Sequence, residues 1–221
     1  MTSKNDFIKK SGETLSDLYD LLQNLEPLDL KDLPPQNSVL IIVDMINGFA
    51  REGALQSPRV DALIPGITEL SLKCDEKGIK KIAFADCHTD ASPEFEAYPA
   101  HCKMDTSESE IVSEIKEVGG YTLIPKNSTN GFLEPVFQQW LIDHSKITNF
   151  IIVGDCTDIC IQQFAITLKT WFNRKDKKVN VIVPVNLVDT YDFGLHDADL
   201  LHVVALYNMM GNGVKVVKSI G

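Results

Sequence analysis

From residue 38 onward, short apolar runs rich in β-branched residues alternate with longer segments of helical periodicity. The runs cover residues 38–43, 80–85, 121–124, 149–153, 179–185 and 214–217. They are almost continuously apolar, which is typical of parallel strands covered on both faces. Helical periodicity lies between them, at residues 61–77, 108–117, 132–145, 158–173 and 197–210. This alternation predicts an α/β fold of three layers, with a six-stranded parallel sheet and helices on both faces.

The segment before the first run has a different pattern. Apolar residues recur there at steps of three and four, namely Phe7, Ile8, Leu15, Leu18, Leu21, Leu22 and Leu25. The spacing predicts an amphipathic helix, which Pro34-Pro35 ends at the latest. We therefore divide the chain into an N-terminal helical extension, residues 1–36, and one domain, residues 37–221. We expect the helix to pack on the domain, and the alternative is that it docks on a second subunit of a homo-oligomer.

The charge balance argues against two classes of partner. Asp and Glu outnumber Lys and Arg by 31 to 21 among 221 residues, a formal charge of −10. Nucleic acids and anionic membranes attract basic surfaces, so neither is an expected partner. The apolar runs are also far shorter than the ~20 residues of a membrane-spanning helix. Five cysteines follow a polar start without a secretory pattern, which favours free thiols in the cytoplasm.

Chemically active residue types directly follow four of the runs. Asp44 follows the first run, Asp86 and His88 the second, Lys126 the third and the segment 154–160 the fourth. Open parallel sheets bind ligands at the carboxyl ends of their strands. These side chains are therefore expected at one edge of the sheet.

Cys160 lies where the fourth run gives way to a helix, a position that favours a thiolate. A cysteine nucleophile needs a base for its proton and a cation near its sulfur, and Asp44 and Lys126 fit these roles. Amide N–H groups at the same helix start could hold an oxyanion. Cys156 competes for the role of nucleophile, and an inert buried cysteine is the alternative to both.

A second constellation joins Asp86, His88, Glu94 and His101. Asp86 and His88 share one face of an extended segment, and loops can bring Glu94 and His101 to the same ion. Two imidazoles with one or two carboxylates suit one divalent transition metal ion, with Zn as the first expectation and Fe or Mn as alternatives. Ligands of mixed nitrogen and oxygen type leave open positions for water or substrate.

Other arrangements of this segment remain open. A closed structural zinc site would use Cys87, Cys102 and the two histidines, although Cys87 should face away from its neighbours in an extended stretch. A polar surface loop without metal is a further alternative. Spacing alone does not decide whether Glu94 or Glu96 faces the ion.

Three segments occur in a characteristic order, VDMINGF at 43–49, PKNSTNGF at 125–132 and GDCTDIC at 154–160. Together they resemble the isochorismatase-like cysteine hydrolases, and the resemblance covers about residues 37–218. It implies a six-stranded parallel sheet with helices on both faces, in agreement with the hydrophobic pattern.

Within that superfamily, Asp86-x-His88 followed by Pro99-x-His101 is similar to the nicotinamidases. Glu94 matches the position of an extra carboxylate ligand in some of them. The resemblance implies an amidohydrolase that converts nicotinamide to nicotinate and ammonia, with a place in NAD salvage. It also implies one divalent metal ion that binds the pyridine nitrogen of this small amide substrate.

The resemblance implies catalytic roles for Cys160, which follows the fourth run, and for Asp44 and Lys126. Asp44 takes the proton of Cys160, Lys126 stabilises the pair, and the thiolate attacks the amide carbon to form a thioester. The backbone amides of Cys156 and Cys160 hold the oxyanion. A cis peptide falls at Asp155–Cys156 in this alignment.

Two aromatic residues lie close to these segments in the sequence, Phe49 after Asp44 and Tyr98 just before Pro99 and His101. Either ring could form a wall for a flat, partly apolar ligand, and core packing is the alternative for each. The resemblance implies that both contact the pyridine ring.

Three departures from the usual family pattern occur: Ile46 and Gly48 replace a Gln and an Asp, Cys87 replaces an aromatic residue, and Asp155-Cys156 replaces small apolar residues. These changes motivate a second hypothesis, a cysteine hydrolase of the same superfamily that acts on another small amide or ureide. A third hypothesis is a non-catalytic binding protein on this fold. The complete set of acid, lysine and thiol argues against the third.

Overall fold

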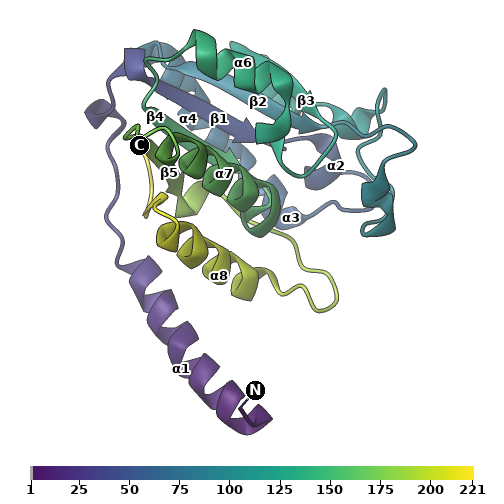
Figure 1. Cartoon of the computed structure of the whole chain (residues 1–221). Coiled ribbons are helices and arrows are strands. Elements are labelled where there is room, and N and C mark those ends of the chain that lie inside the picture. Colours follow the sequence, from purple (N-terminus) through teal and green to yellow (C-terminus); the bar gives the residue numbers. More distant parts are fainter. Residues whose placement is uncertain (1) are drawn as a thin grey trace.

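The computed structural model describes residues 2–221 and places six parallel strands in one sheet, in the order β3-β2-β1-β4-β5-β6 (Figure 1). The strands are β1 Ser38–Val43, β2 Lys80–Asp86, β3 Tyr121–Lys126, β4 Asn149–Gly154, β5 Asn180–Pro184 and β6 Lys215–Val217. Every neighbouring pair is parallel. The predicted six-stranded parallel sheet is therefore confirmed.

Helices cover both faces of this sheet, so the predicted three layers are present. They are α1 Lys4–Gln23, α2 Asn47–Ala50, α3 Pro58–Asp61, α4 Ile64–Lys77, α5 Ser113–Val118, α6 Pro135–Asp143, α7 Gln162–Asn173 and α8 Ala198–Gly211. Helices α6, α7 and α8 share one hydrophobic core with the sheet, and α2 to α5 share the other (Figure 1).

Strand β1 shows why the apolar runs are continuous. Val39, Ile41 and Val43 belong to the core beneath α6, α7 and α8, whereas Leu40 and Ile42 belong to the core beneath α4. Successive side chains of a strand point to opposite faces, and here both faces are buried. An alternating polar residue would therefore be buried without a partner.

The order of the strands reverses at β1, which has β2 on one side and β4 on the other. Such a reversal opens a crevice at the carboxyl ends of the strands. Val43 pairs with Phe84 in β2 and Gly154 in β4, and Asp86 pairs with Lys126 across β2 and β3. The ends of four neighbouring strands therefore meet at one edge.

One predicted helix is shorter than its periodicity suggests. The helix expected at residues 108–117 begins at Ser113. Ser107–Ser109 form a short 3-10 helix instead, and the chain then becomes extended at Ile111, which forms an antiparallel bridge with Ile46 after β1. A tertiary contact therefore overrides the local preference for helix.

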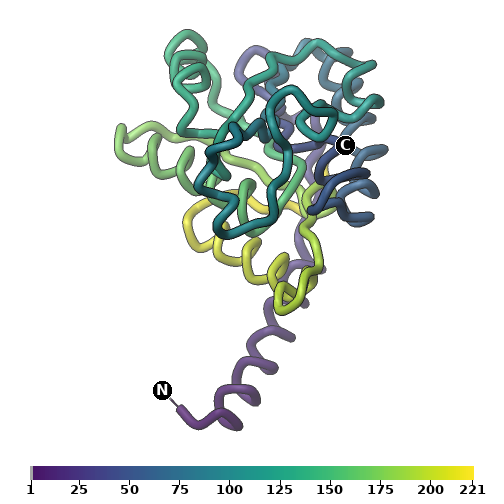
Figure 2. Tube along the Cα trace, turned by 90° about the vertical axis from the view of Figure 1, so that its right-hand side faces the viewer, coloured from purple at the N-terminus to yellow at the C-terminus, as the bar shows by residue number. Residues whose placement is uncertain are grey.

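Helix α1 is present but lies mostly outside the domain, as Figures 1 and 2 show. Leu22 is its single buried residue, and Leu25 just beyond it packs against the core. The expected packing on the domain is therefore limited to Leu22 and to contacts of α1 with α8, and most of the helix is exposed. Amphipathic spacing identifies a face that is suited to burial, but it does not specify the surface that buries it.

Across residues 2–221, no helix combines the length and apolar character that crossing a membrane requires.

Gly154 generates a prediction about stability. It ends β4 at φ 114°, and a Cβ there would lie 1.9 Å from the carbonyl oxygen of Val43. We expect Gly154→Ala to force β1 and β4 apart and to lower the free energy of unfolding by more than about 3 kcal/mol, measured by urea denaturation. Gly211→Ala is the control, because nothing lies near its Cβ in α8. Equal stability of the two variants would contradict the close approach.

Candidate active site

An acid, a cation and a thiol meet at the carboxyl edge of the sheet, and all three are buried. Lys126 Nζ lies 2.8 Å from Asp44 Oδ2 and 3.8 Å from Cys160 Sγ. A second carboxylate, that of Asp86, accepts a hydrogen bond from the same ammonium at 2.5 Å. The sequence positions of these residues predicted this convergence.

Asp44 directly follows β1 and has φ 56°, a left-handed conformation that non-glycine residues rarely adopt. Its backbone N–H donates to the carbonyl oxygen of Phe84 at 3.0 Å, and its Oδ1 accepts the N–H of Asp86 at 3.0 Å. These two bonds to β2 hold the carboxylate in place. They leave Oδ2 facing Lys126 and free to take a proton.

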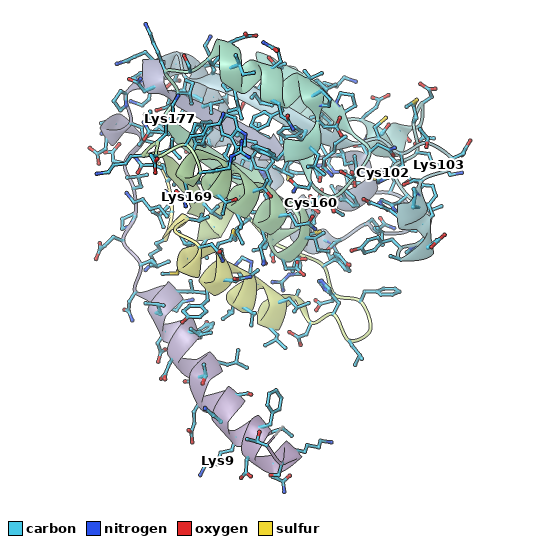
Figure 3. All side chains as sticks on the ribbon, viewed as in Figure 1. Lys9, Cys102, Lys103, Cys160, Lys169 and Lys177 are labelled. Atoms are coloured by element: carbon cyan, nitrogen blue, oxygen red, sulfur yellow. The ribbon has the colours of Figure 1, made fainter. Side chains whose placement is uncertain are left out.

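Cys160 lies in a π turn, Thr157–Ile161, that leads into α7 (Figure 3). The helix predicted at residues 158–173 therefore begins irregularly, and π turns of this kind often occur at functional sites. The peptide Asp155–Cys156 is cis, as the family resemblance implies. The Cys156 thiol donates to Asp155 Oδ2 at 3.3 Å. Since Lys126 approaches the Cys160 sulfur, the geometry favours Cys160 over Cys156 as the nucleophile.

Burial and the ammonium set the protonation states of this group. Burial raises the pKa of the Asp44 carboxyl to about 6, while the Lys126 charge limits the rise. Burial also raises the pKa of the Cys160 thiol well above its usual range, and Lys126 opposes this. Burial alone would lower the pKa of Lys126, but Asp44 and Asp86 hold it well above the usual value. The resting group is therefore a thiol beside an ammonium, with Asp44 as the proton acceptor.

Asp86, His88 and His101 form a candidate metal centre next to this group. One ligand atom from each lies within 4.8 Å of the others, and all three residues are buried. Asp86 uses Oδ1 for Lys126, while its Oδ2 lies 3.4 Å from His88 Nε2 and 3.8 Å from His101 Nε2. Asp86 therefore belongs to both groups, with one oxygen for each.

Each of the two histidines makes a hydrogen bond through Nδ1, the ring nitrogen that faces away from Asp86, and these bonds are compatible with metal binding through Nε2. His88 Nδ1 lies 3.1 Å from Asn127 Oδ1, and His101 Nδ1 lies 2.8 Å from the carbonyl oxygen of Pro99. Both partners are acceptors, so each Nδ1 carries the proton and each Nε2 presents a lone pair toward Asp86. His88 Nε2 is buried without a hydrogen-bond partner. Lone pairs that converge on a carboxylate are favourable only around a cation.

Glu94 supplies a fourth donor atom at the same place. Its Oε1 accepts the N–H of Thr129, and its Oε2 is buried without a partner, 3.7 Å from His88 Nε2. Glu96 is exposed, so Glu94 is the carboxylate that faces the histidines. These donors fit the divalent transition metal that the sequence suggested.

The rival zinc site with two thiols has no support among the described residues. The group that could hold a metal contains no cysteine. Cys102 is buried against Gly48, where an added Cβ would lie 2.6 Å from its sulfur.

A pocket that opens to solvent, with about 300 Å³ of empty space, connects the Cys160 thiol to His101. Its polar lining includes Asp86, Glu94, His101 and Cys160, and its apolar lining includes Phe49, Leu55, Tyr98, Ile159 and Tyr191. The pocket is narrow and walled by rings, so it suits a small molecule with a flat apolar part. The two predicted aromatic residues, Phe49 and Tyr98, therefore lie where a ligand would contact them.

Sequence reasoning missed Tyr191, which reaches the pocket from the loop before α8. Its ring stacks on His196, with centroids 4.2 Å apart and planes 4° from parallel. His196 Nε2 lies 2.9 Å from Asp158 Oδ2 in the π turn of Cys160. Only the folded loop brings these residues together, and no local motif marks them. Phe95 was missed for the same reason, although its ring lies 5.6 Å from that of His88.

Comparisons with known proteins add the following similarities. A family model described as the isochorismatase domain matches residues 38–215. Nicotinamidase 1 of Arabidopsis thaliana is 32% identical over 237 residues, covering 92% of this chain and 96% of the plant protein. The crystal structure of a pyrazinamidase of Pyrococcus horikoshii in complex with zinc is 25% identical, with a TM-score of 0.68 over 82% of this chain and 98% of that one. An N-carbamoylsarcosine amidase from Thermoplasma acidophilum shares the fold, with 20% identity and a TM-score of 0.67 over 82% of this chain and 95% of that one.

The hydrogen bond between His88 Nδ1 and Asn127 leads to a prediction about metal binding. Asn127→Ala removes the acceptor that fixes the Nδ1–H tautomer, so we expect the Kd for Zn²⁺ to rise about 10-fold to 100-fold. Competition with a chromophoric chelator measures this Kd. Asn173→Ala, an exposed asparagine at the end of α7, is the matched control and should bind Zn²⁺ as the wild type does. Unchanged affinity in Asn127→Ala would argue against His88 as a ligand.

Proposed function

The chain belongs to the isochorismatase family, and from this premise we propose that it is a metal-dependent cysteine amidohydrolase that converts nicotinamide to nicotinate and ammonia. The main support for the proposal is that Asp86 contacts both the thiol–ammonium group and the candidate metal centre. One of its oxygens contacts the ammonium beside the Cys160 thiol, and the other faces the lone pairs of two histidines. A small aromatic amide suits such a pocket. Its ring nitrogen could face the metal ligands while its carboxamide, a few ångströms away, faces the thiol.

In the proposed first step, a proton moves from Cys160 Sγ to Asp44 Oδ2. The transfer leaves the net charge of the site unchanged, because one negative charge moves from the carboxylate to the thiolate. Both groups lie beside the same Lys126 ammonium. The thiolate attacks the amide carbon, and the backbone N–H groups of Cys156 and Cys160 stabilise the oxyanion. The Cys156 N–H suits this role because, within residues 2–221, it donates to no backbone oxygen.

The tetrahedral species then collapses with loss of ammonia. Asp44 returns the proton to the departing nitrogen, the C–N bond breaks, and a thioester with Cys160 remains. Water attacks the thioester, with Asp44 as its base, and releases nicotinate and the thiol. Asp44 alternates between base and acid, a role that suits a carboxyl group whose pKa burial raises to about 6.

Asp86, His88, Glu94 and His101 would hold the divalent metal. When bound, the ion supplies a Lewis-acidic position for a ring nitrogen, and the substrate amide then lies toward Cys160. Zn is the first expectation, and the same donors accept Fe or Mn. Phe49 and Tyr98 would stack against the ring and exclude water from it.

Another small amide or ureide is the alternative substrate, suggested by the departures at Ile46, Gly48 and Cys87. These three residues are not among those that line the pocket. Gly48 instead accommodates the Cys102 sulfur, and Ile46 pairs with Ile111. The departures at Gly48 and Ile46 therefore adjust the packing behind the site, whereas the departure at Cys156 lies in the pocket lining itself.

This reaction would return nicotinamide to NAD salvage as nicotinate. All five cysteines are free. Free thiols suit a reducing compartment, which supports the proposal of a cytoplasmic enzyme.

Ammonia release tests the proposed reaction and its metal dependence together. We expect nicotinamide to yield one ammonia per nicotinate, activity to disappear on chelation, and added Zn²⁺, Fe²⁺ or Mn²⁺ to restore it. Pyrazinamide should also react, whereas ureido acids should not. If the Zn²⁺-loaded protein releases ammonia only from ureido acids, nicotinamide is the wrong substrate. Activity that survives complete metal removal would reject the metal dependence.

Substitution of the thiol tests the proposed nucleophile. We expect Cys160→Ala to lower kcat by more than about 10⁴-fold while Zn²⁺ content and melting temperature stay close to those of the wild type. Cys74→Ala, in the core beneath α4, removes a buried thiol far from the pocket and should retain activity. Cys156→Ala should reduce turnover without abolishing it. Substantial turnover by Cys160→Ala would overturn the assignment.

A further inference from the structure

The loop between β5 and α8 places an aromatic wall of the pocket beside the turn that carries the thiol. Tyr191 of this loop lines the pocket together with Ile159 and Cys160 of the π turn. The loop, drawn in yellow-green ahead of α8 in Figure 1, is separated from that turn by α7 and β5. The distance between the wall and the nucleophile therefore depends on contacts between the two segments.

One imidazole, that of His196, connects the loop to the turn. Its Nδ1 lies 2.7 Å from the carbonyl oxygen of Tyr191, and its Nε2 lies 2.9 Å from Oδ2 of Asp158. Both nitrogens face oxygen acceptors, and an imidazolium satisfies the two with one N–H each. The side chains of His196 and Asp158 are only 19% and 13% exposed, so solvent ions screen this pair less than a surface ion pair.

The same imidazole also fixes the orientation of the Tyr191 ring. The two rings stack with their centroids 4.2 Å apart and their planes 4° from parallel. Backbone hydrogen bonds in both directions between Phe193 and His196 close the loop into a tight hairpin, which keeps the imidazole beside the tyrosine. Asp192 ties the loop to α8, because its Oδ1 accepts the N–H of Ala198. The tyrosine ring is therefore held in place by the loop itself.

We propose that Tyr191 positions the substrate in the pocket, and that His196 acts through it by joining the ring to the turn of the nucleophile. Such a role rests on the proposed hydrolysis of nicotinamide, to which it adds a binding residue. A ring that is fixed before the substrate arrives loses little freedom on binding, so it contributes affinity at a low entropic cost. Because the wall contacts substrate and transition state alike, its loss should change KM rather than kcat.

A purely structural role for His196 is the alternative, in which it only holds the π turn in shape. That turn has other anchors. The N–H of Thr157 donates to the carbonyl oxygen of Asp189 at 2.9 Å, and its Oγ1 lies 2.9 Å from His202 Nδ1. Among the described residues, in contrast, the ring of Tyr191 stacks on no aromatic side chain besides His196. The imidazole therefore matters more to the wall than to the turn.

Steady-state kinetics with nicotinamide and the Zn²⁺-loaded protein separate the two roles. We expect Tyr191→Ala to raise KM about tenfold and His196→Ala to raise it about threefold, with kcat close to the wild-type value in both. The double variant should match Tyr191→Ala, because His196 then has no ring left to position. Tyr191→Phe should raise KM less than Tyr191→Ala, since it keeps a ring on the imidazole.

His144→Ala is the matched control. His144 at the end of α6 stacks on Trp140 with centroids 4.1 Å apart, and its Nδ1 lies 2.9 Å from the carbonyl oxygen of Trp140. Neither residue lines the pocket, so KM should equal that of the wild type. Calorimetric titration of nicotinamide into Zn²⁺-loaded Cys160→Ala, with and without Tyr191→Ala, should show the same rise of about tenfold in Kd without turnover.

Several outcomes would overturn the proposal. Unchanged KM and Kd in Tyr191→Ala would exclude Tyr191 as a binding residue while leaving the proposed reaction intact. A loss of kcat at constant KM in His196→Ala would show that His196 supports the π turn instead. Additive effects in the double variant would contradict a shared role. If the wild-type protein neither hydrolyses nor binds nicotinamide, the proposed function fails, and the role of Tyr191 in it fails as well.

Discussion

The structure of the site depends on one buried ammonium. Lys126 is fully enclosed and lies between the carboxylates of Asp44 and Asp86, with the Cys160 sulfur nearby. Removing one partner from such a buried cluster costs about 3–5 kcal/mol, because the charges that remain lose their compensation. The lysine also couples the two halves of the site, because the same charge favours a thiolate on one side and an ionised Asp86 on the other.

This coupling explains how one crevice can serve two kinds of chemistry. Hydrogen-bond acceptors at Asn127 and Pro99 hold the Nδ1 atoms of the two histidines, so the Nε2 lone pairs converge on the second oxygen of Asp86. In the proposed reaction, a metal held there would bind and orient the ring, whereas Asp44 would take the proton of the thiol and the sulfur would form the new bond. Each residue is supplied by a strand end or by the loop that follows it. The rigid sheet therefore sets the distance between the two centres.

The N-terminal helix obeys different constraints. It contributes one buried residue to the core, and neither it nor its groove contains a residue of the pocket. The apolar side chains of its first turns, Phe7 and Ile8, are exposed. Helix α1 can therefore vary in sequence and in contact without altering the geometry at Cys160.

The sequence by itself determined the strands, their parallel arrangement and the residues that end them. A buried parallel strand must be apolar on both faces, and a polar residue at its carboxyl end must face the crevice. Asp44, Asp86, Lys126 and Cys160 could therefore be identified from local pattern and spacing. The start of α5 could not, because the bridge between Ile46 and Ile111 that delays it joins distant segments.

Only the tertiary structure decided which groups meet and how. The 2.5 Å contact between Lys126 and Asp86, the acceptor at Asn127 that fixes the His88 tautomer, and the contact of His196 with Asp158 all join residues far apart in the chain. It also showed that most of α1 lies outside the domain. Periodicity reports which side chains of an element prefer burial, but the surface that buries them depends on contacts that no local pattern encodes.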